Sequence, residues 1–245
     1  MSLLQIDVDD KRFGARTVLR GLRVGLAAGE IVGLLGASGC GKSTLLAIAA
    51  GLDRDARASV RLDGRPLAGP DAGIGFVFQE PRLFPWLTVA QNVAFGASGR
   101  HADADAIEAL LAEVGLGGRG EALPKHLSGG QAQRVALARG LYTHPRVLLL
   151  DEPFSAVDAI TRTALQDLLA RVAAERGLGV LLVTHDIDEA VHLSDRIVLL
   201  ERQPGPPRAE LQVGLPRPRR RGDARAGALR ERLLGLLDAG IDASA

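Results

Sequence analysis

The chain has 245 residues and a formal net charge of +1, which suits one large α/β domain and provides no general attraction to nucleic acid or lipid. Its single cysteine, Cys40, excludes internal disulfides and fits a reducing compartment. The segment Met1–Asp10 alternates apolar and acidic residues, unlike a secretion signal, and no apolar run approaches the roughly 18 residues of a membrane-spanning helix. We expect a soluble protein that could serve a membrane only through a partner.

The N-terminal part is predicted to form a small antiparallel β-layer. Apolar and polar residues alternate over residues 4–8 and 22–26, and residues 59–62 lead into an Asp-Gly turn that extends the same layer. Between the first two strands, Lys11–Gly14 is interpreted as a polar connection. Its aromatic residue, Phe13, either stacks on an adenine ring or packs under a loop, and the sequence does not decide between them.

A glycine-rich turn then separates the apolar run Ile31–Leu35 from a helical stretch that ends at Gly51. The turn matches the phosphate-loop pattern, because its glycines let several N–H groups converge on one anion at the start of a helix. The candidate nucleotide-binding residues are Gly36, Ala37, Ser38, Gly39, Cys40, Gly41, Lys42, Ser43 and Thr44.

Two residues of this turn have specific predicted roles, and a third does not. Lys42 supplies a mobile positive charge for the outer phosphates, and the Ser43 hydroxyl can bind Mg²⁺. Cys40 is interpreted as a small turn residue, because no second thiol lies nearby in the sequence.

Residues 81–142 are predicted to form a helical insertion. A short buried strand at Ile74–Phe78 ends at Gln79, prolines follow, and apolar residues then recur at helical spacing over residues 107–114. Trp86 lies in a short apolar cluster near the start of this insertion. We favour a place in the subdomain core for it over a docking surface.

The segment Leu127–Gln131 precedes a helical stretch and allows two interpretations. Ser128 and Gln131 have capping-box spacing, which predicts a well-capped helix. Gly129 and Gly130 favour a second anion site, because glycines cost stability at a helix start but allow close approach to free N–H groups.

Two further buried strands end in polar residues. The apolar run Val147–Leu150 leads into Asp151, which can hold Mg²⁺ through water, and Glu152, which can orient and deprotonate an attacking water. The run at residues 180–183 leads to His185, for which a catalytic and a structural role are equally open.

The C-terminal part contains a last core strand at Ile197–Leu200, a Pro/Gly-rich break, a basic run and a short helix over residues 229–236. The basic run, within Pro216–Arg221, is interpreted as a solvated segment, with contact to acidic lipid as the alternative.

Together these motifs resemble the ATP-binding subunits of ABC transporters, over essentially the whole chain. Gly36–Thr44 is similar to the Walker A loop and Val147–Glu152 to Walker B, and Leu127–Gln131 matches the LSGGQ signature letter for letter. The resemblance implies an α/β P-loop NTPase (RecA-like) core with an antiparallel β-subdomain and an inserted helical subdomain at about 81–142. The ATPase domain would span residues 1–205, followed by a C-terminal tail at 206–245.

The resemblance also implies ATP and Mg²⁺ as cofactors and assigns further site residues. Gln79 would be the Q-loop residue and a metal ligand with Ser43 and Asp151, and His185 the switch histidine. Phe13 would be the adenine-stacking aromatic, although tyrosine is commoner there. The D-loop would be residues 155–158, with Asp158 near the nucleotide.

The resemblance further implies a homodimer in head-to-tail arrangement, because each ATP then lies between the Walker A loop of one copy and the signature of the other. The residues that would bind the γ-phosphate from the second copy are Ser128, Gly129, Gly130 and Gln131.

The implied partners are two membrane permease subunits and, through them, a substrate-binding protein, at the cytoplasmic face of the inner membrane. Phe78–Trp86 resembles the nitrate, taurine and sulfonate importers, and Leu215–Gly222 looks most like the aliphatic sulfonate importers. We therefore expect uptake of aliphatic sulfonates, with taurine or nitrate as alternatives.

Other classes fit less well. A soluble ABC-type ATPase acting on nucleic acid would need long coiled coils or two cassettes, and the sequence has neither. The near-neutral net charge also gives no sign of a basic surface that would bind nucleic acid. A P-loop kinase or GTPase would leave the signature stretch unexplained, and exporters usually fuse this cassette to membrane helices.

Overall fold

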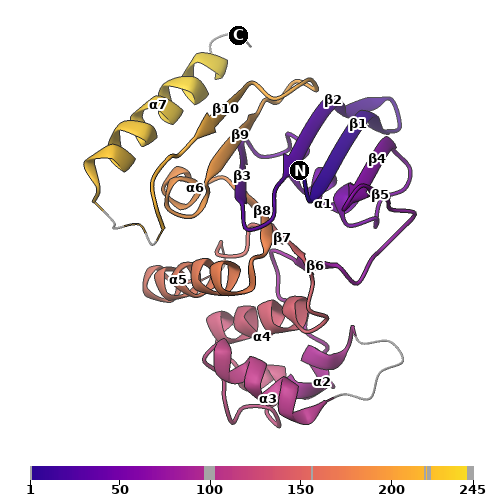
Figure 1. Ribbon diagram of the computed structural model, residues 1–245, viewed down its shortest axis with the longest axis vertical. Coiled ribbons are helices and arrows are strands. Elements are labelled where there is room, and N and C mark those ends of the chain that lie inside the picture. The colour runs from indigo at the N-terminus through magenta and orange to yellow at the C-terminus, as the bar shows by residue number, and fades with distance from the viewer. Residues whose placement is uncertain (1, 97–102, 156, 218, 220–221, 242–245) are drawn as a thin grey trace.

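In the computed structural model, which describes residues 2–96, 103–155, 157–217, 219 and 222–241, the strands form two β-sheets (Figure 1). One has four strands in the order β2-β1-β4-β5, and the other has six in the order β10-β9-β3-β8-β7-β6. The strands are β1 (Leu4–Phe13), β2 (Arg16–Leu26), β3 (Ile31–Gly36), β4 (Arg57–Leu62), β5 (Arg65–Pro66), β6 (Ile74–Val77), β7 (Val147–Asp151), β8 (Gly179–Thr184), β9 (Arg196–Leu200) and β10 (Ala209–Gln212).

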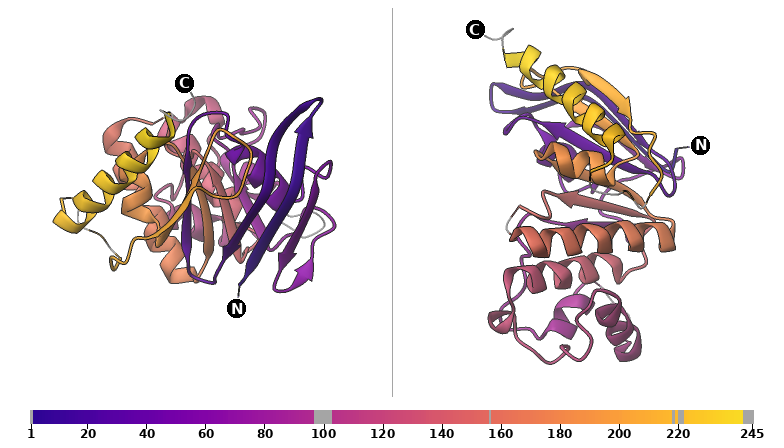
Figure 2. Two further views of the ribbon diagram at one scale, coloured as in Figure 1. Left: turned by 90° about the horizontal axis from the view of Figure 1, so that it is seen from above. Right: turned by 90° about the vertical axis from the view of Figure 1, so that its left-hand side faces the viewer.

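The helices lie around these sheets in separate groups. In Figures 1 and 2, α2, α3 and α4 form a layer at one end of the molecule, and α5 lies between that layer and the six-stranded sheet. Helix α6 lies beside this sheet, and α7 packs on α6 toward the other end. None of the helices in the described part of the chain is both long and apolar enough to cross a membrane. The helices are α1 (Lys42–Ala49), α2 (Val89–Ala94), α3 (Ala104–Glu113), the 3₁₀ helix η1 (Pro124–His126), α4 (Gly129–Leu141), α5 (Ala159–Arg176), α6 (Ile187–Leu193) and α7 (Ala224–Ile241).

The six-stranded sheet is parallel except for β10, which pairs antiparallel with β9. Its strands β3, β7 and β8 are buried almost throughout, as continuous apolar runs in a sheet covered on both faces should be. Because parallel strands end on the same edge, the residues after β3, β6, β7 and β8 meet there. The candidate site residues that follow these strands therefore lie close together at this edge.

The four-stranded sheet confirms the predicted antiparallel β-layer, but Lys11–Gly14 is not a loop. Strand β1 continues to Phe13 and β2 begins at Arg16, so only two residues connect them. Burial alternates up to Val8 and then changes phase, because the pairing register between β1 and β4 shifts between Val8 and Asp10. Lys11 is therefore turned to the buried side of the sheet, where its side chain is 2% exposed.

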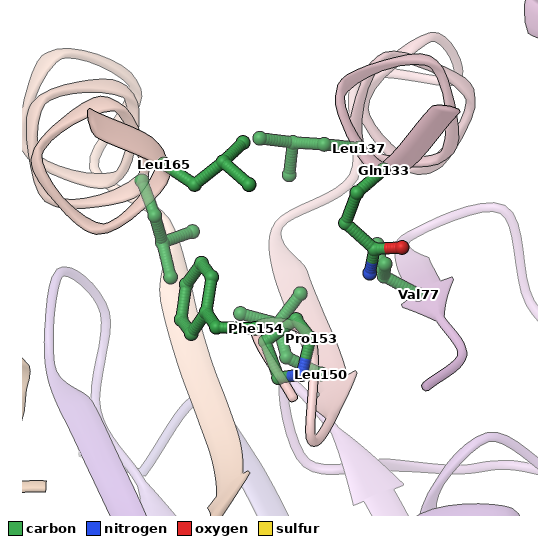
Figure 3. A pocket seen from close by; sticks show the side chains of 8 residues that line it. Val77, Gln133, Leu137, Leu150, Pro153, Phe154 and Leu165 are labelled. Atoms are coloured by element: carbon green, nitrogen blue, oxygen red, sulfur yellow. The ribbon is translucent and has the colours of Figure 1, made fainter. Parts of the chain in front are cut away.

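The helical layer is joined to the sheet by an apolar core that includes one small cavity (Figure 3). The cavity lies between α4, α5 and the ends of β6 and β7, and its volume of about 10 Å³ is close to the least that can hold one water. The amide of Gln133 on α4 is the polar side chain of its lining, and its Nε2 donates to the Phe78 carbonyl at 3.4 Å. The lining residues are Val77, Gln133, Leu137, Leu150, Pro153, Phe154, Leu165 and Leu169.

The insertion contains helices as predicted, but the core interpretation of Trp86 is wrong. Trp86 is 72% exposed and contacts the ring of Phe84, with centroids 5.6 Å apart. The buried side chain of Asn92 accepts from the Phe84 N–H at 2.8 Å and donates to the Leu87 carbonyl at 3.1 Å. These bonds satisfy the backbone on both sides of Trp86 and leave the indole outside the subdomain.

The C-terminal part is more ordered than expected from its sequence. Strand β10 was not predicted, and the helix expected to be short, α7, has 18 residues. Leu233 of α7 is fully buried in an apolar cluster with α6, β9 and β10. An apolar stripe on one face of α7 therefore packs on α6 and joins the apolar cluster beside β9 and β10.

Two arginines of the basic run are not solvated, contrary to the expectation. Arg219 is 3% exposed, and its guanidinium donates to the carbonyls of Val191, His192 and Ser194 at 2.7–3.0 Å. Arg217 donates to the Gly29 carbonyl at 2.9 Å. The last carbonyls of α6 lack partners within the helix, and the five donors of an arginine satisfy them.

These two arginines also share the carboxylate of Asp195, at 3.1 and 3.4 Å. The lipid interpretation is therefore unsupported for Arg217 and Arg219, while Pro218, Arg220 and Arg221 of the same run lie outside the described residues.

Replacing Arg219 by alanine should destabilise the protein by about 2–3 kcal/mol, because several buried carbonyls would lose their donor. For a chain of this size that corresponds to a fall in Tm of roughly 4–12 °C. Arg225→Ala is the matched control, since its exposed side chain pairs with the neighbouring Asp223. Thermal unfolding followed by circular dichroism checks this, and equal Tm values for both variants would contradict it.

Candidate functional site

The phosphate loop runs from the end of β3 to the start of α1. Lys42 is 5% exposed and folds back over the loop, where its Nζ donates to the carbonyls of Gly36 at 2.7 Å and Ala37 at 3.0 Å. Gly41 has φ 95°, and a Cβ there would lie 2.6 Å from a Leu19 methyl carbon. A Cβ on Gly36 would lie 2.7 Å from the Leu200 carbonyl oxygen, so both positions require glycine.

The middle of the loop is open and its end is buried. Ala37, Ser38 and Gly39 are exposed, whereas Cys40 is buried with its Sγ 3.9 Å from Lys42 Nζ. Burial raises the pKa of the Cys40 thiol, which disfavours the reactive thiolate. This supports the interpretation of Cys40 as a turn residue.

The structure brings two of the three predicted metal ligands together. The Ser43 hydroxyl donates to Asp151 Oδ1 at 3.0 Å. Burial raises the pKa of Asp151, the bond from Ser43 opposes this, and the charge of Glu152 adds to the rise. A hydroxyl and a carboxylate are oxygen donors of the kind Mg²⁺ prefers, so the donor set fits that ion. The third predicted ligand, Gln79, instead donates from its amide to Ser155 Oγ at 3.3 Å.

Glu152 and His185 form a pair across neighbouring strands. His185 Nδ1 lies 3.0 Å from Glu152 Oε2, and the imidazole is 62% exposed. Glu152 has φ 43°, a left-handed conformation that non-glycine residues rarely adopt. Hydrogen bonds hold it there, from the Glu152 N–H to the Val183 carbonyl at 3.0 Å and from Ser155 Oγ to the Glu152 carbonyl at 3.0 Å. This backbone strain has no signal in the sequence.

The signature segment begins α4, in the helical layer. Ser128 is the N-cap, and its hydroxyl and the Gln131 side chain form the predicted capping box. A Cβ on Gly130 would lie 2.2 Å from the Thr161 methyl, so this glycine allows α4 to pack on α5. Figure 1 shows α4 beside α2 and α3, while β3 and α1 lie with the sheets. Within one chain, therefore, the signature segment and the phosphate loop belong to different layers.

The family profile described as ABC transporter matches residues 19–155 of the chain. This chain belongs to the ABC transporter family. It is 60% identical over 241 residues to the aliphatic sulfonates import ATP-binding protein SsuB 1 of Xanthomonas axonopodis pv. citri (strain 306), covering 96% of this chain and 95% of the relative. It is 55% identical to the protein of the same name from Pseudomonas syringae pv. syringae (strain B728a), covering 95% of each chain.

A solved structure of the same family has a similar fold. It is an ATP-binding cassette described as the dimeric post-hydrolysis state bound to ADP and phosphate, with a TM-score of 0.74 and 30% identity. The match covers 86% of this chain and 98% of the other. The predicted fold class, an α/β P-loop NTPase core with an antiparallel β-layer and inserted helices, is thus confirmed for this member of the ABC transporter family.

Two further predicted site residues lie away from the strand edge. Phe13 is 56% exposed, so the alternative that it packs under a loop is wrong, and its ring is accessible to a base. Asp158 is the N-cap of α5 and accepts from the Thr161 N–H at 3.0 Å. Hydrogen bonds from Thr161 hold the pKa of the Asp158 carboxyl below its usual range.

The prediction from sequence missed an acidic residue next to this ABC-type site. Glu189 on α6 is 6% exposed, and burial, with Asp186 nearby, raises its pKa to about 8. Its Oε1 has no hydrogen-bond partner among the described residues. A glutamate in a short polar-faced helix carries no sequence signal for burial, so only the packing of α6 could identify it.

Proposed function

We propose that this chain is the ATP-hydrolysing subunit of an importer of aliphatic sulfonates. The observation that carries the ATPase function is the Glu152–His185 pair. It lies with Ser43 and Asp151 at the carboxyl edge of the parallel strands, where the phosphate loop follows β3. The sulfonate substrate is supported by relatives whose names state it and which match the chain almost from end to end.

Nucleotide binding is assigned to the open cradle of the phosphate loop. ATP phosphates would take the N–H groups of Gly36–Thr44 and the ammonium of Lys42, which in this structure donates to groups of the loop itself. Phe13 would stack on adenine. Ser43, Asp151 and Gln79 would hold Mg²⁺, which when bound neutralises charge on the phosphates.

Hydrolysis is assigned to the pair at the ends of β7 and β8. Glu152 would orient a water and accept its proton as the water attacks the γ-phosphorus. The hydrogen bond to His185 would keep the carboxylate in place, while the exposed imidazole would contact the γ-phosphate. The strained backbone of Glu152 supports this assignment, because such strain concentrates at functional sites.

The last wall of the site is assigned to a second copy of the chain. Ser128 and Gly129 are exposed at the N-terminus of a 13-residue helix, where free N–H groups favour an anion. In a head-to-tail dimer the residues Ser128–Gln131 of one copy would reach the γ-phosphate bound by the other, with Asp158 near the interface. The solved dimeric relative supports this arrangement.

The partners would be two permease subunits and, through them, a substrate-binding protein, at the cytoplasmic face of the inner membrane. The exposed residues Trp86 and Phe95 and the half-buried Phe84 form a contiguous aromatic patch with ring centroids 4.1–5.6 Å apart, of the kind enriched at protein interfaces. We assign this patch to the permease contact. The ATPase domain would span residues 1–205, with residues 81–142 as helical subdomain and 206–245 as tail.

The other candidate functions have less support. A nucleic-acid-dependent ATPase would be expected to carry a basic footprint, whereas the net charge is +1. Taurine and nitrate remain alternatives within the same importer role, because residues that bind the transported molecule would belong to other subunits.

The substrate is tested in the reconstituted importer. ATP hydrolysis should be measured in liposomes with the binding protein loaded in turn with alkanesulfonates, taurine and nitrate. We expect alkanesulfonates to stimulate phosphate release severalfold above the unloaded binding protein, and the Glu152→Gln complex to show no stimulation. Stimulation by nitrate or taurine alone would reject the sulfonate assignment but leave the importer role intact.

A further inference from the structure

Lys11 is a buried cation beside the candidate adenine site. It is one of three lysines in the chain, and its side chain is 2% exposed. Its Nζ donates to Asp53 Oδ1 at 2.7 Å and to the Asp55 carbonyl at 3.1 Å. The same ammonium lies over the ring of Phe13, 4.7 Å from its centroid. The register shift in β1 that turns Lys11 inward makes these contacts possible.

The partners of Lys11 connect two parts of the nucleotide site. Asp53 and Asp55 follow the C-terminus of α1, and the Asp53 N–H donates to the Ala47 carbonyl of that helix at 3.1 Å. Since α1 begins in the phosphate loop, Lys11 links the strand that carries Phe13 to the far end of the phosphate-binding helix. A buried ammonium needs such partners, because an unpaired one would be costly.

The contact also constrains the ring. An ammonium within about 6 Å of an aromatic centroid is attracted to the ring face. Phe13 has no hydroxyl through which a hydrogen bond could orient it, so packing and this cation are what hold its plane. One face is next to Lys11, and the ring is still 56% exposed. The other face is therefore the one available for stacking.

We propose that Lys11 is a positioning residue for nucleotide binding, which holds Phe13 so that adenine stacks on the ring face opposite the ammonium. The cation draws electron density toward its own side of the ring, which makes the opposite face a better partner for an electron-rich purine. The inference rests on the adenine role of Phe13 under the proposed function.

A purely structural role for Lys11 makes a different prediction. If Lys11 only tied β1 to the loop after α1, its loss would lower the affinity for all ligands of the phosphate loop by the same factor. If it positions Phe13, its loss should lower the affinity for ATP. The affinity for inorganic triphosphate, which has the phosphates but no base, should not change.

The test compares the dissociation constants of ATP and inorganic triphosphate by calorimetry without magnesium, so that no hydrolysis occurs. Lys11→Met combined with Asp53→Asn avoids an unpaired carboxylate and should raise the Kd of ATP about 3- to 10-fold, with that of triphosphate unchanged. Lys11→Arg should preserve ATP affinity, because a guanidinium also lies well on a ring. Arg12→Met, an exposed neighbour, should change neither.

Phe13→Ala completes a double-mutant cycle. Phe13→Ala should raise the Kd of ATP but not that of triphosphate. Removing Lys11 in the Phe13→Ala background should not change the Kd of ATP further. Equal losses for ATP and triphosphate, or additive losses in the cycle, would overturn the proposal. If Phe13→Ala leaves ATP affinity intact, the adenine assignment and the Lys11 role both fail. Failure of the wild-type chain to bind ATP would instead reject the proposed function.

Discussion

Glu152→Gln should lower ATP hydrolysis by about 10²- to 10⁴-fold while leaving ATP binding close to wild type. Glutamine keeps the size of the side chain and can still bond to His185, 3.0 Å away, but it cannot accept the proton of the attacking water. Because the γ-phosphate would persist, the two copies should remain joined, and the variant should accumulate as an ATP-dependent dimer.

Hydrolysis is measured as phosphate release, ATP binding as a dissociation constant, and dimer formation by size-exclusion chromatography with Mg-ATP. The matched control is Glu175→Gln, an exposed carboxylate on α5 that pairs with Arg171 and should behave as wild type. ATPase activity near wild type in Glu152→Gln would remove Glu152 from the role of base. Loss of ATP binding would show that the side chain is needed to build the cradle.

Ser128→Arg should lower hydrolysis by about 100-fold or more without a comparable change in nucleotide affinity. Ser128 is exposed at the start of α4, and α4 lies in a different layer from the phosphate loop (Figure 1). A bulky side chain there should block closure onto the ATP of the second copy, while binding to the first copy continues.

The Ser128→Arg substitution also removes a helix cap, so the loss of stability from the missing cap must be separated from the steric block of dimer closure. Ser128→Ala loses the same cap, at a cost of about 1 kcal/mol, but adds no bulk. We expect both variants to show a similar fall in Tm, and only the arginine variant to prevent ATP-dependent dimer formation. If Ser128→Arg weakens ATP binding by the isolated monomer, the signature segment does not act from a second copy.

Local patterns predicted most of the fold and supplied the candidate site residues, because these patterns depend on neighbours in sequence. The apolar run before the phosphate loop needs burial on both faces, and the glycines at 36 and 41 leave the backbone room that a Cβ would fill. The capping box at Ser128 depends only on residues three positions apart. The antiparallel layer followed from simple alternation up to Val8.

Two of the errors come from contacts between segments distant in sequence, and the third comes from a contact within one segment. Arg219 looked like part of a solvated basic run, but the carbonyls that bury it come from the end of α6. Lys11 looked like a loop residue until a register shift against β4 turned it inward. Trp86 looked like core, but Asn92 satisfies the backbone around it and leaves it exposed.

The sequence by itself determined the family motifs and the parallel core, and it supplied the candidate residues for binding phosphate, metal and water. Only the tertiary structure decided their geometry. The left-handed Glu152 beside His185, the meeting of Ser43 with Asp151, and the ion pair of Lys11 with Asp53 all join different elements of the fold. Local propensity reaches a few residues along the chain, whereas these contacts depend on how strands pair and helices pack.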